Sequence, residues 1–157
     1  MTRRWLRAQT RQGDVLRAGF QAVRDEQGVP AAFPDEVLAE AVRIAGAPQP
    51  PPSPDGGARR DATDLPFVTI DPAGSTDLDQ AVHIERRGSG FRVNYAIADV
   101  ASFVAPGSTL DVEAHLRGVT FYSPDLRTSL HPPVLSEGVA SLLADVVRPA
   151  VLWRIDL

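Results

Sequence analysis

Three aspartates in one short loop have the residue type and spacing of a metal site. Asp71, Asp77 and Asp79 lie within nine positions of the chain, around a Pro-Ala-Gly-Ser turn. Asp77 and Asp79 are two residues apart, so in an extended segment their side chains point to the same side, and the turn can fold Asp71 back toward them. Converging carboxylates repel one another unless a cation neutralises them. An oxygen-only donor set favours Mg²⁺, Mn²⁺ or Ca²⁺.

A second interpretation of this loop stays open. Asp and Ser beside Gly and Pro are common turn formers, and their side chains often cap their own backbone. The spacing of the three aspartates does not by itself separate a metal site from an ordinary turn.

After residue 63, where this loop lies, apolar and polar residues mostly alternate with the period of β-strands, and two helical segments interrupt this pattern. The expected strands cover residues 67–70, 81–85, 91–97, 119–122 and 150–157, the second and third forming a hairpin. One helix is expected from the capping sequence Ser108-Thr-Leu-Asp111 to Arg117, and a second over 135–143. A loop of aspartates therefore lies directly before a hairpin.

The first third of the chain follows the period of α-helices instead. Apolar residues recur at helical spacing over 14–26 and again over 34–45, with a break at Gly28. We expect a helix-turn-helix-like module at 1–47 and a Pro- and Gly-rich linker at 48–63. Such a pair of helices is either a packing unit or a reader of DNA or RNA.

Composition excludes several classes of protein. The 157 residues contain no cysteine, which excludes disulfide scaffolds and zinc-thiolate sites and fits a cytoplasmic location. No apolar run is long enough for a membrane span, so no membrane partner is expected. The formal net charge is −4, and the acidity lies after residue 60. Charge alone therefore does not indicate a nucleic-acid-binding protein.

An ordered series of short motifs after the linker resembles the start of the catalytic RNB domain of the ribonuclease II and R family. The motifs are Leu65-Pro-Phe-Val-Thr-Ile-Asp71, Ser75-Thr-Asp-Leu-Asp79, Tyr95-Ala-Ile-Ala-Asp-Val100, Tyr122-Ser-Pro, Leu130-His-Pro, Leu135-Ser-Glu, Ser141-Leu-Leu and Arg148-Pro-Ala. The resemblance covers residues 64–157 and leaves residues 1–60 uncovered. It implies an α+β protein in which the helical module precedes the N-terminal part of a mixed α/β RNB domain.

The resemblance implies a 3′-to-5′ exoribonuclease that hydrolyses single-stranded RNA to nucleoside 5′-monophosphates with Mg²⁺, or with Mn²⁺ in its place. Asp71, Asp77 and Asp79 would be catalytic metal ligands, with Asp79 the least replaceable, and Tyr122 would hold the terminal nucleotide by stacking. The family commonly has a fourth aspartate after Asp79, where this chain has Gln80. A neutral amide still offers an oxygen ligand but adds no charge.

Three further interpretations stay open. The first is a non-catalytic RNA-binding or regulatory protein that retains part of the RNB scaffold, which Gln80 and the shortness of the matched segment favour. The second is a DNA-binding role for residues 14–46. The third concerns Arg117, Arg127 and Arg148, which either contact phosphates or form ion pairs with the acidic residues that follow residue 60. The three histidines share no metal-ligand spacing and are expected to be structural or solvated.

Overall fold

The computed structural model describes residues 11–47, 53 and 56–157 and confirms the α+β class. Residues 1–10 of the predicted helical module, and residues 48–52 and 54–55 of the predicted linker, lie outside the described residues. The helices are α1 (Arg11–Glu26), α2 (Asp35–Ala45) and α3 (Thr109–Arg117), with the short turns η1 (Val100–Ser102) and η2 (Leu135–Val139). The strands are β1 (Gln80–Arg87), β2 (Gly90–Ala98), β3 (Phe121–Tyr122), β4 (Arg127–Thr128) and β5 (Ala150–Asp156).

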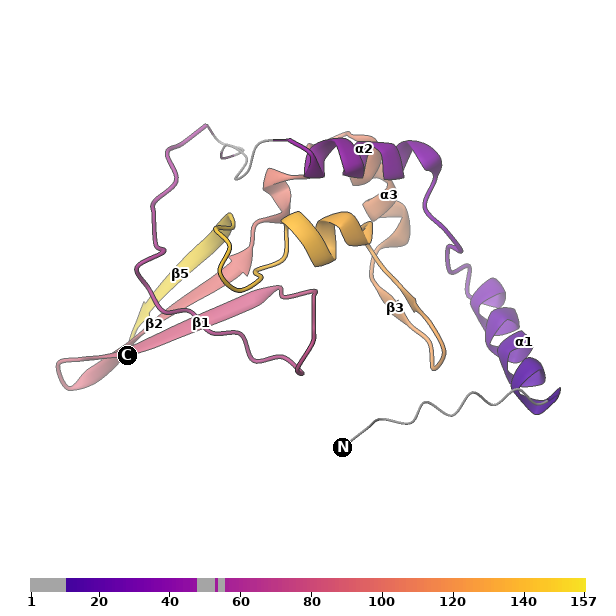
Figure 1. Cartoon of the computed structure of the whole chain (residues 1–157), viewed down its shortest axis with the longest axis horizontal. Helices are drawn as coiled ribbons and strands as arrows, with labels where there is room; N and C mark the ends of the chain where they lie inside the picture. The colour runs from indigo at the N-terminus through magenta and orange to yellow at the C-terminus, as the bar shows by residue number, and fades with distance from the viewer. Residues whose placement is uncertain (1–10, 48–52, 54–55) are drawn as a thin grey trace.

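The main sheet has the order β1-β2-β5, with both pairs antiparallel (Figure 1). The predicted hairpin is confirmed: β1 and β2 pair from Gln80↔Ile97 to Arg87↔Gly90, and Gly88 makes the tight turn with a φ of 62°. The predicted strand at 67–70 is wrong in extent. Only an isolated bridge between Val68 and Val82 forms there, because the chain then turns away into the acidic loop.

Helix α3 forms where its capping residues predict it. The Ser108 side chain accepts a hydrogen bond from the Asp111 backbone N–H at 3.2 Å, and Gly118 ends the helix with a φ of 73°. The second predicted helix, over 135–143, is shorter than expected. The helical segment that forms there, η2, ends at Val139, and Gly138 within it has a non-helical backbone with φ −121° and ψ −109°. The residues beyond it pair with the acidic loop instead.

The hydrophobic core joins α2 to elements that lie between β2 and β5 in the chain. Val37 and Ala41 of α2 lie in one buried cluster with Leu110 of α3 and Leu135 of η2. Figure 1 shows α2 lying along α3 and η2, on the side away from the main sheet. The second helix of the predicted N-terminal module therefore packs with the later part of the chain. The boundaries at residues 47 and 63 remain predictions.

Helix α1 stands apart from this core. Its apolar residues Val15, Leu16 and Val23 are 57–70% exposed, so the amphipathic pattern does not place them in the core. Its last turn is attached by Arg24, which is itself 8% exposed and lies 2.6 Å from Asp125 between β3 and β4. No helix in the described part of the chain is both long and apolar enough to cross a membrane.

A carboxylate of α2 holds the start of α3, and this contact predicts a pH dependence. Glu40 accepts hydrogen bonds from the Thr109 hydroxyl and from the Leu110 backbone N–H, and the Thr109 hydroxyl is the larger cause that lowers the pKa of Glu40. A carboxyl whose pKa is lowered by folding contributes stability at pH values above its ordinary pKa. That contribution is lost as the pH falls through the lowered value.

We therefore expect Glu40→Gln to lower the free energy of unfolding by about 1–2 kcal/mol at pH 7, with a loss that shrinks as the pH falls below 4. Urea denaturation across this range measures it. Glu36→Gln is the matched control, because Glu36 lies in the first turn of the same helix and is exposed. A difference from wild type that stays constant down to pH 3 would contradict the assignment.

Candidate active site

The acidic loop is held at both ends by the main sheet. Val68 exchanges two backbone hydrogen bonds with Val82 of β1, at 3.0 and 2.9 Å. At the other end, the Ala98 backbone N–H donates to the Asp79 carbonyl at 2.9 Å. Asp79 is therefore fixed where β1 begins, beside the end of β2. Asp71 lies in the exposed stretch between these two anchors.

The loop is also fastened to the segment that follows η2. The Ser141 hydroxyl, 1% exposed, donates to the Thr76 carbonyl at 2.7 Å and accepts from the Leu78 backbone N–H at 2.9 Å. The Leu142 N–H donates to the Leu78 carbonyl at 2.8 Å, and the Leu78 side chain is buried. Because side chains alternate along an extended chain, this places Asp77 and Asp79 on the side opposite Leu78.

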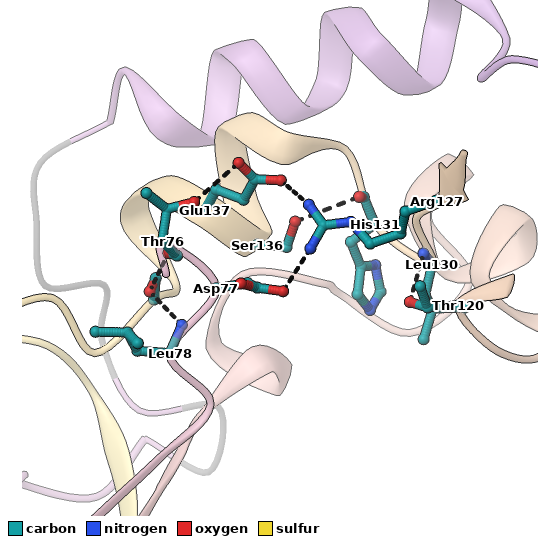
Figure 2. A network of polar contacts seen from close by, with 10 residues as sticks. Thr76, Asp77, Leu78, Thr120, Arg127, Leu130, His131, Ser136 and Glu137 are labelled. Atoms are coloured by element: carbon teal, nitrogen blue, oxygen red, sulfur yellow. Dashed lines mark hydrogen bonds and ion pairs between the residues drawn. The ribbon is translucent and has the colours of Figure 1, made fainter. Parts of the chain in front are cut away.

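Asp77 is paired with an arginine from the β3–β4 ribbon (Figure 2). Nη1 of Arg127 lies 2.5 Å from Oδ2 of Asp77, and Nη2 of the same guanidinium contacts Glu137 of η2. The second oxygen of Glu137 accepts a hydrogen bond from the Thr76 hydroxyl at 3.0 Å. One cation therefore lies between two carboxylates, and one of those carboxylates is fastened to the loop.

Asp79 lines a small cavity and is affected by its acidic neighbours. The cavity, of about 60 Å³, is otherwise mostly apolar; its walls include Phe103, Val104 and Leu135. Partial burial raises the pKa of Asp79, and the negative charges of Asp77 and Asp71 raise that pKa further. The three carboxylates therefore lie near enough to repel one another. A divalent cation relieves this repulsion, and its preference for oxygen ligands fits this donor set.

The structure does not bring the three aspartates into ligand geometry. Within residues 11–47, 53 and 56–157, no group of three or more His, Cys, Asp or Glu side chains is close enough to hold a metal ion. The predicted metal site at Asp71, Asp77 and Asp79 therefore remains a prediction, supported by the effect of Asp77 and Asp71 on the pKa of Asp79. Ligation by Asp77 requires that Arg127 give up the oxygen it now contacts.

Gln80, the fourth predicted ligand, is engaged elsewhere. Its side-chain oxygen accepts a hydrogen bond from the Tyr95 hydroxyl, across the β1–β2 hairpin. Gln80 and Asp79 are consecutive residues at the start of a strand, so their side chains point to opposite faces. A metal-binding role for Gln80 remains a prediction, and it requires that this contact break.

Tyr122, the predicted stacking residue, is 77% exposed on β3. It lies directly opposite Arg127 of β4 in the ribbon's antiparallel register. Directly opposite residues of an antiparallel pair share one face. The exposed ring therefore lies on the same face as the guanidinium that reaches the acidic loop, and stacking on RNA remains a prediction.

Sequence reasoning missed three residues of this site. Ser141 and Glu137 lie within motifs that the resemblance covers, but nothing in their local spacing shows that they bind a loop more than 60 residues away. His131 lines the same cavity as Asp79, and its buried Nδ1 finds no hydrogen-bond partner among the described residues. Burial lowers the pKa of His131, which keeps the ring neutral at pH 7.

The other candidates have structural partners. Arg117 donates to Glu113 at 2.7 Å, and Arg148 donates to the Ser141 carbonyl at 3.1 Å. His83 packs edge-on against Phe67, and His115 lies 3.3 Å from Asp111 on α3. Arg117 is thus paired with an acid, whereas the partners of Arg148 among the described residues are backbone carbonyls rather than a carboxylate.

Comparison with known proteins gives one consistent family. Residues 59–157 match the family described as RNB domain. Ribonuclease R of Acidithiobacillus ferrooxidans is 42% identical over 148 residues, which are 92% of this chain and 33% of that protein. The "Inactive exonuclease DIS3L2" of Arabidopsis thaliana is 43% identical over 101 residues, which are 62% of this chain and 10% of that protein. The chain thus spans a third or less of these two relatives.

Solved structures agree with the sequence matches. Mycoplasma genitalium RNase R, in complex with double-stranded RNA and with ribose-methylated single-stranded RNA, superposes with a TM-score of 0.79 at 29% identity. The match covers 88% of this chain and 24% and 21% of those two chains. The family match covers most of the chain and includes the acidic loop, the ribbon and η2. The chain therefore belongs to the RNB-domain family of ribonucleases of the ribonuclease II and R type.

Proposed function

We propose that the native protein containing this sequence is a 3′-to-5′ exoribonuclease that hydrolyses single-stranded RNA to nucleoside 5′-monophosphates with the help of Mg²⁺, in the cytoplasm. The observation that carries the proposal is the acidic loop. Partial burial and the charges of Asp77 and Asp71 raise the pKa of Asp79, and contacts with Ser141 and Glu137 hold the loop in place. Membership of a ribonuclease family supplies the class of substrate.

In this proposal Asp71, Asp77 and Asp79 hold Mg²⁺, and Mn²⁺ would fit the same oxygen donors. The bound cations would polarise the scissile phosphate and lower the pKa of an attacking water. The chain's own residues would position the loop and the RNA. Ser141 fixes the backbone from which Asp77 and Asp79 project, and mostly apolar residues line the cavity beside Asp79. Tyr122 offers a ring face that any terminal base can stack on.

The direction of degradation tests the proposal. A 5′-end-labelled single-stranded RNA should give labelled products that shorten gradually, with the labelled mononucleotide appearing last. An unlabelled 3′-phosphate on the same RNA should slow the reaction, while a 5′-phosphate should not. Early release of labelled mononucleotide, or a fixed internal cut, would contradict 3′-to-5′ degradation.

A second candidate function is RNA binding without catalysis. Two observations favour it: the oxygen of Gln80 is occupied by the Tyr95 hydroxyl, and one of the relatives is named an inactive exonuclease. This candidate predicts salt-sensitive RNA binding with no nucleotide release in Mg²⁺.

A further inference from the structure

Arg127 is placed to do more than pair with the acidic loop. Its side chain is 34% exposed, and its guanidinium contacts Asp77 and Glu137 at the surface rather than in the core. Its cross-strand neighbour is the exposed Tyr122. The ribbon thus presents an aromatic ring and an arginine on one face, with the arginine reaching the proposed metal-binding loop.

The two carboxylates around Arg127 are not equivalent. Glu137 is anchored through its other oxygen by the Thr76 hydroxyl, so it can hold the arginine independently of Asp77. Asp77 has a competing task in the proposed function, because its carboxylate would bind a cation. Once its charge is shared with a cation, Asp77 attracts the guanidinium less strongly. Arg127 would then keep one partner and regain free N–H donors.

A phosphate is the ligand that matches those free donors. The planar guanidinium offers parallel N–H groups that pair with two oxygens of a phosphate, and Arg is favoured wherever phosphate is recognised in this way. In metal-dependent phosphodiester hydrolysis the phosphate lies against the cations. It would therefore lie next to Asp77, within reach of the guanidinium of Arg127 that now contacts this carboxylate.

We propose that Arg127 is an RNA-phosphate ligand that Asp77 holds until the acidic loop binds its cation, after which Glu137 keeps it oriented toward the phosphate beside Tyr122. This inference rests on the proposed function. It assigns Arg127 a role that depends on the cation, because the arginine is available to RNA only when Asp77 has released it.

The salt dependence of RNA binding tests this role. The probe is a single-stranded oligoadenylate whose 3′-terminal linkages are phosphorothioates, which resist hydrolysis. With Mg²⁺, Arg127→Gln should weaken binding about tenfold and should make the slope of log K against log salt shallower by about 0.7, the loss of one single-strand phosphate contact. With EDTA in place of Mg²⁺ the two proteins should differ much less. Arg127→Lys should keep the wild-type slope.

The control is Arg43→Gln, because Arg43 is 72% exposed on α2 and forms a local ion pair with Glu40, one turn away on the same helix. It should leave both affinity and slope unchanged. In the wild-type protein, phenylglyoxal labelling of Arg127 followed by mass spectrometry should show protection by RNA in Mg²⁺ but not in EDTA. This measurement needs no variant and so does not depend on the folding of Arg127→Gln.

The outcomes separate this inference from the proposed function. Tight RNA binding by wild type with an unchanged slope in Arg127→Gln, or no protection of Arg127 by RNA, would overturn the inference alone. If Arg127→Gln lost the same affinity for RNA with and without Mg²⁺, the proposed release of Arg127 by Asp77 on cation binding would be overturned. Absence of RNA binding by wild type would overturn the proposed function and the inference with it.

Discussion

Asp79→Asn is expected to lower the rate of nucleotide release from single-stranded RNA by on the order of 10²–10³-fold, the effect of losing one oriented electrostatic group at a reacting centre. Asp79 is the carboxylate whose pKa is raised by partial burial and by Asp77 and Asp71, so it is the position where a cation relieves most repulsion. Asparagine has nearly the same shape but no negative charge. Mononucleotide release from the native protein in Mg²⁺ measures the effect.

The stability of Asp79→Asn separates lost chemistry from a lost fold. A raised pKa means that the folded state disfavours the ionised carboxyl, so Asp79 costs stability at pH values above its raised pKa, and this cost disappears below its ordinary value. Removing the charge should therefore leave the midpoint of urea denaturation at pH 7 unchanged or higher. Asp25→Asn, on the exposed face of α1, is the control for activity. Undiminished nucleotide release by Asp79→Asn would rule out Asp79 as an essential ligand.

Arg117→Met is expected to lower the free energy of unfolding by about 3–5 kcal/mol, because it removes one partner of a buried ion pair. The Arg117 side chain is 1% exposed and lies 2.7 Å from Glu113. It also donates to the Ala32 carbonyl at 2.7 Å and lies 3.7 Å above the Phe33 ring. Methionine fills part of the space but leaves a carboxylate and a carbonyl without their donor.

Arg43→Met is the matched control for this effect. Arg43 is 72% exposed and forms an ion pair with Glu40 one turn away, so its loss should change the free energy of unfolding by less than about 0.5 kcal/mol. Urea denaturation of the two variants at pH 7 measures the difference. Equal stability of Arg117→Met and Arg43→Met would mean that α3 and the segment before α2 are not joined through this arginine.

The local parts of the fold could be predicted because their signals are local. A few neighbouring residues decide each of three features: the cap at Ser108, the helix end at Gly118 and the tight turn at Gly88. The structure confirms helix α3 and the β1–β2 hairpin, which these features delimit. Residues 67–70 have the alternation expected of a strand, but alternation does not show how many of these residues form backbone hydrogen bonds with a neighbouring strand. The structure gives it one bridge at Val68.

The contacts that hold the acidic loop in place could not be predicted, because local patterns do not show which distant residues meet. The contacts of Thr76 with Glu137, of Leu78 with Ser141 and of Asp77 with Arg127 join residues 50 to 63 positions apart. Spacing indicated that three aspartates could converge, and it could not show that an arginine would take one oxygen of Asp77. The same limit explains His131, whose spacing pointed to no site although it lines the cavity beside Asp79.

The central claim is that this acidic loop belongs to a magnesium-dependent exoribonuclease, and one time course tests it most directly. Single-stranded RNA is incubated with the native protein in Mg²⁺ or in EDTA, and nucleoside 5′-monophosphates and protein-bound RNA are both quantified. We predict steady release of monophosphates in Mg²⁺ and none in EDTA, although RNA is bound in both. RNA binding without monophosphate release in Mg²⁺ would contradict the claim and favour the non-catalytic RNA-binding protein.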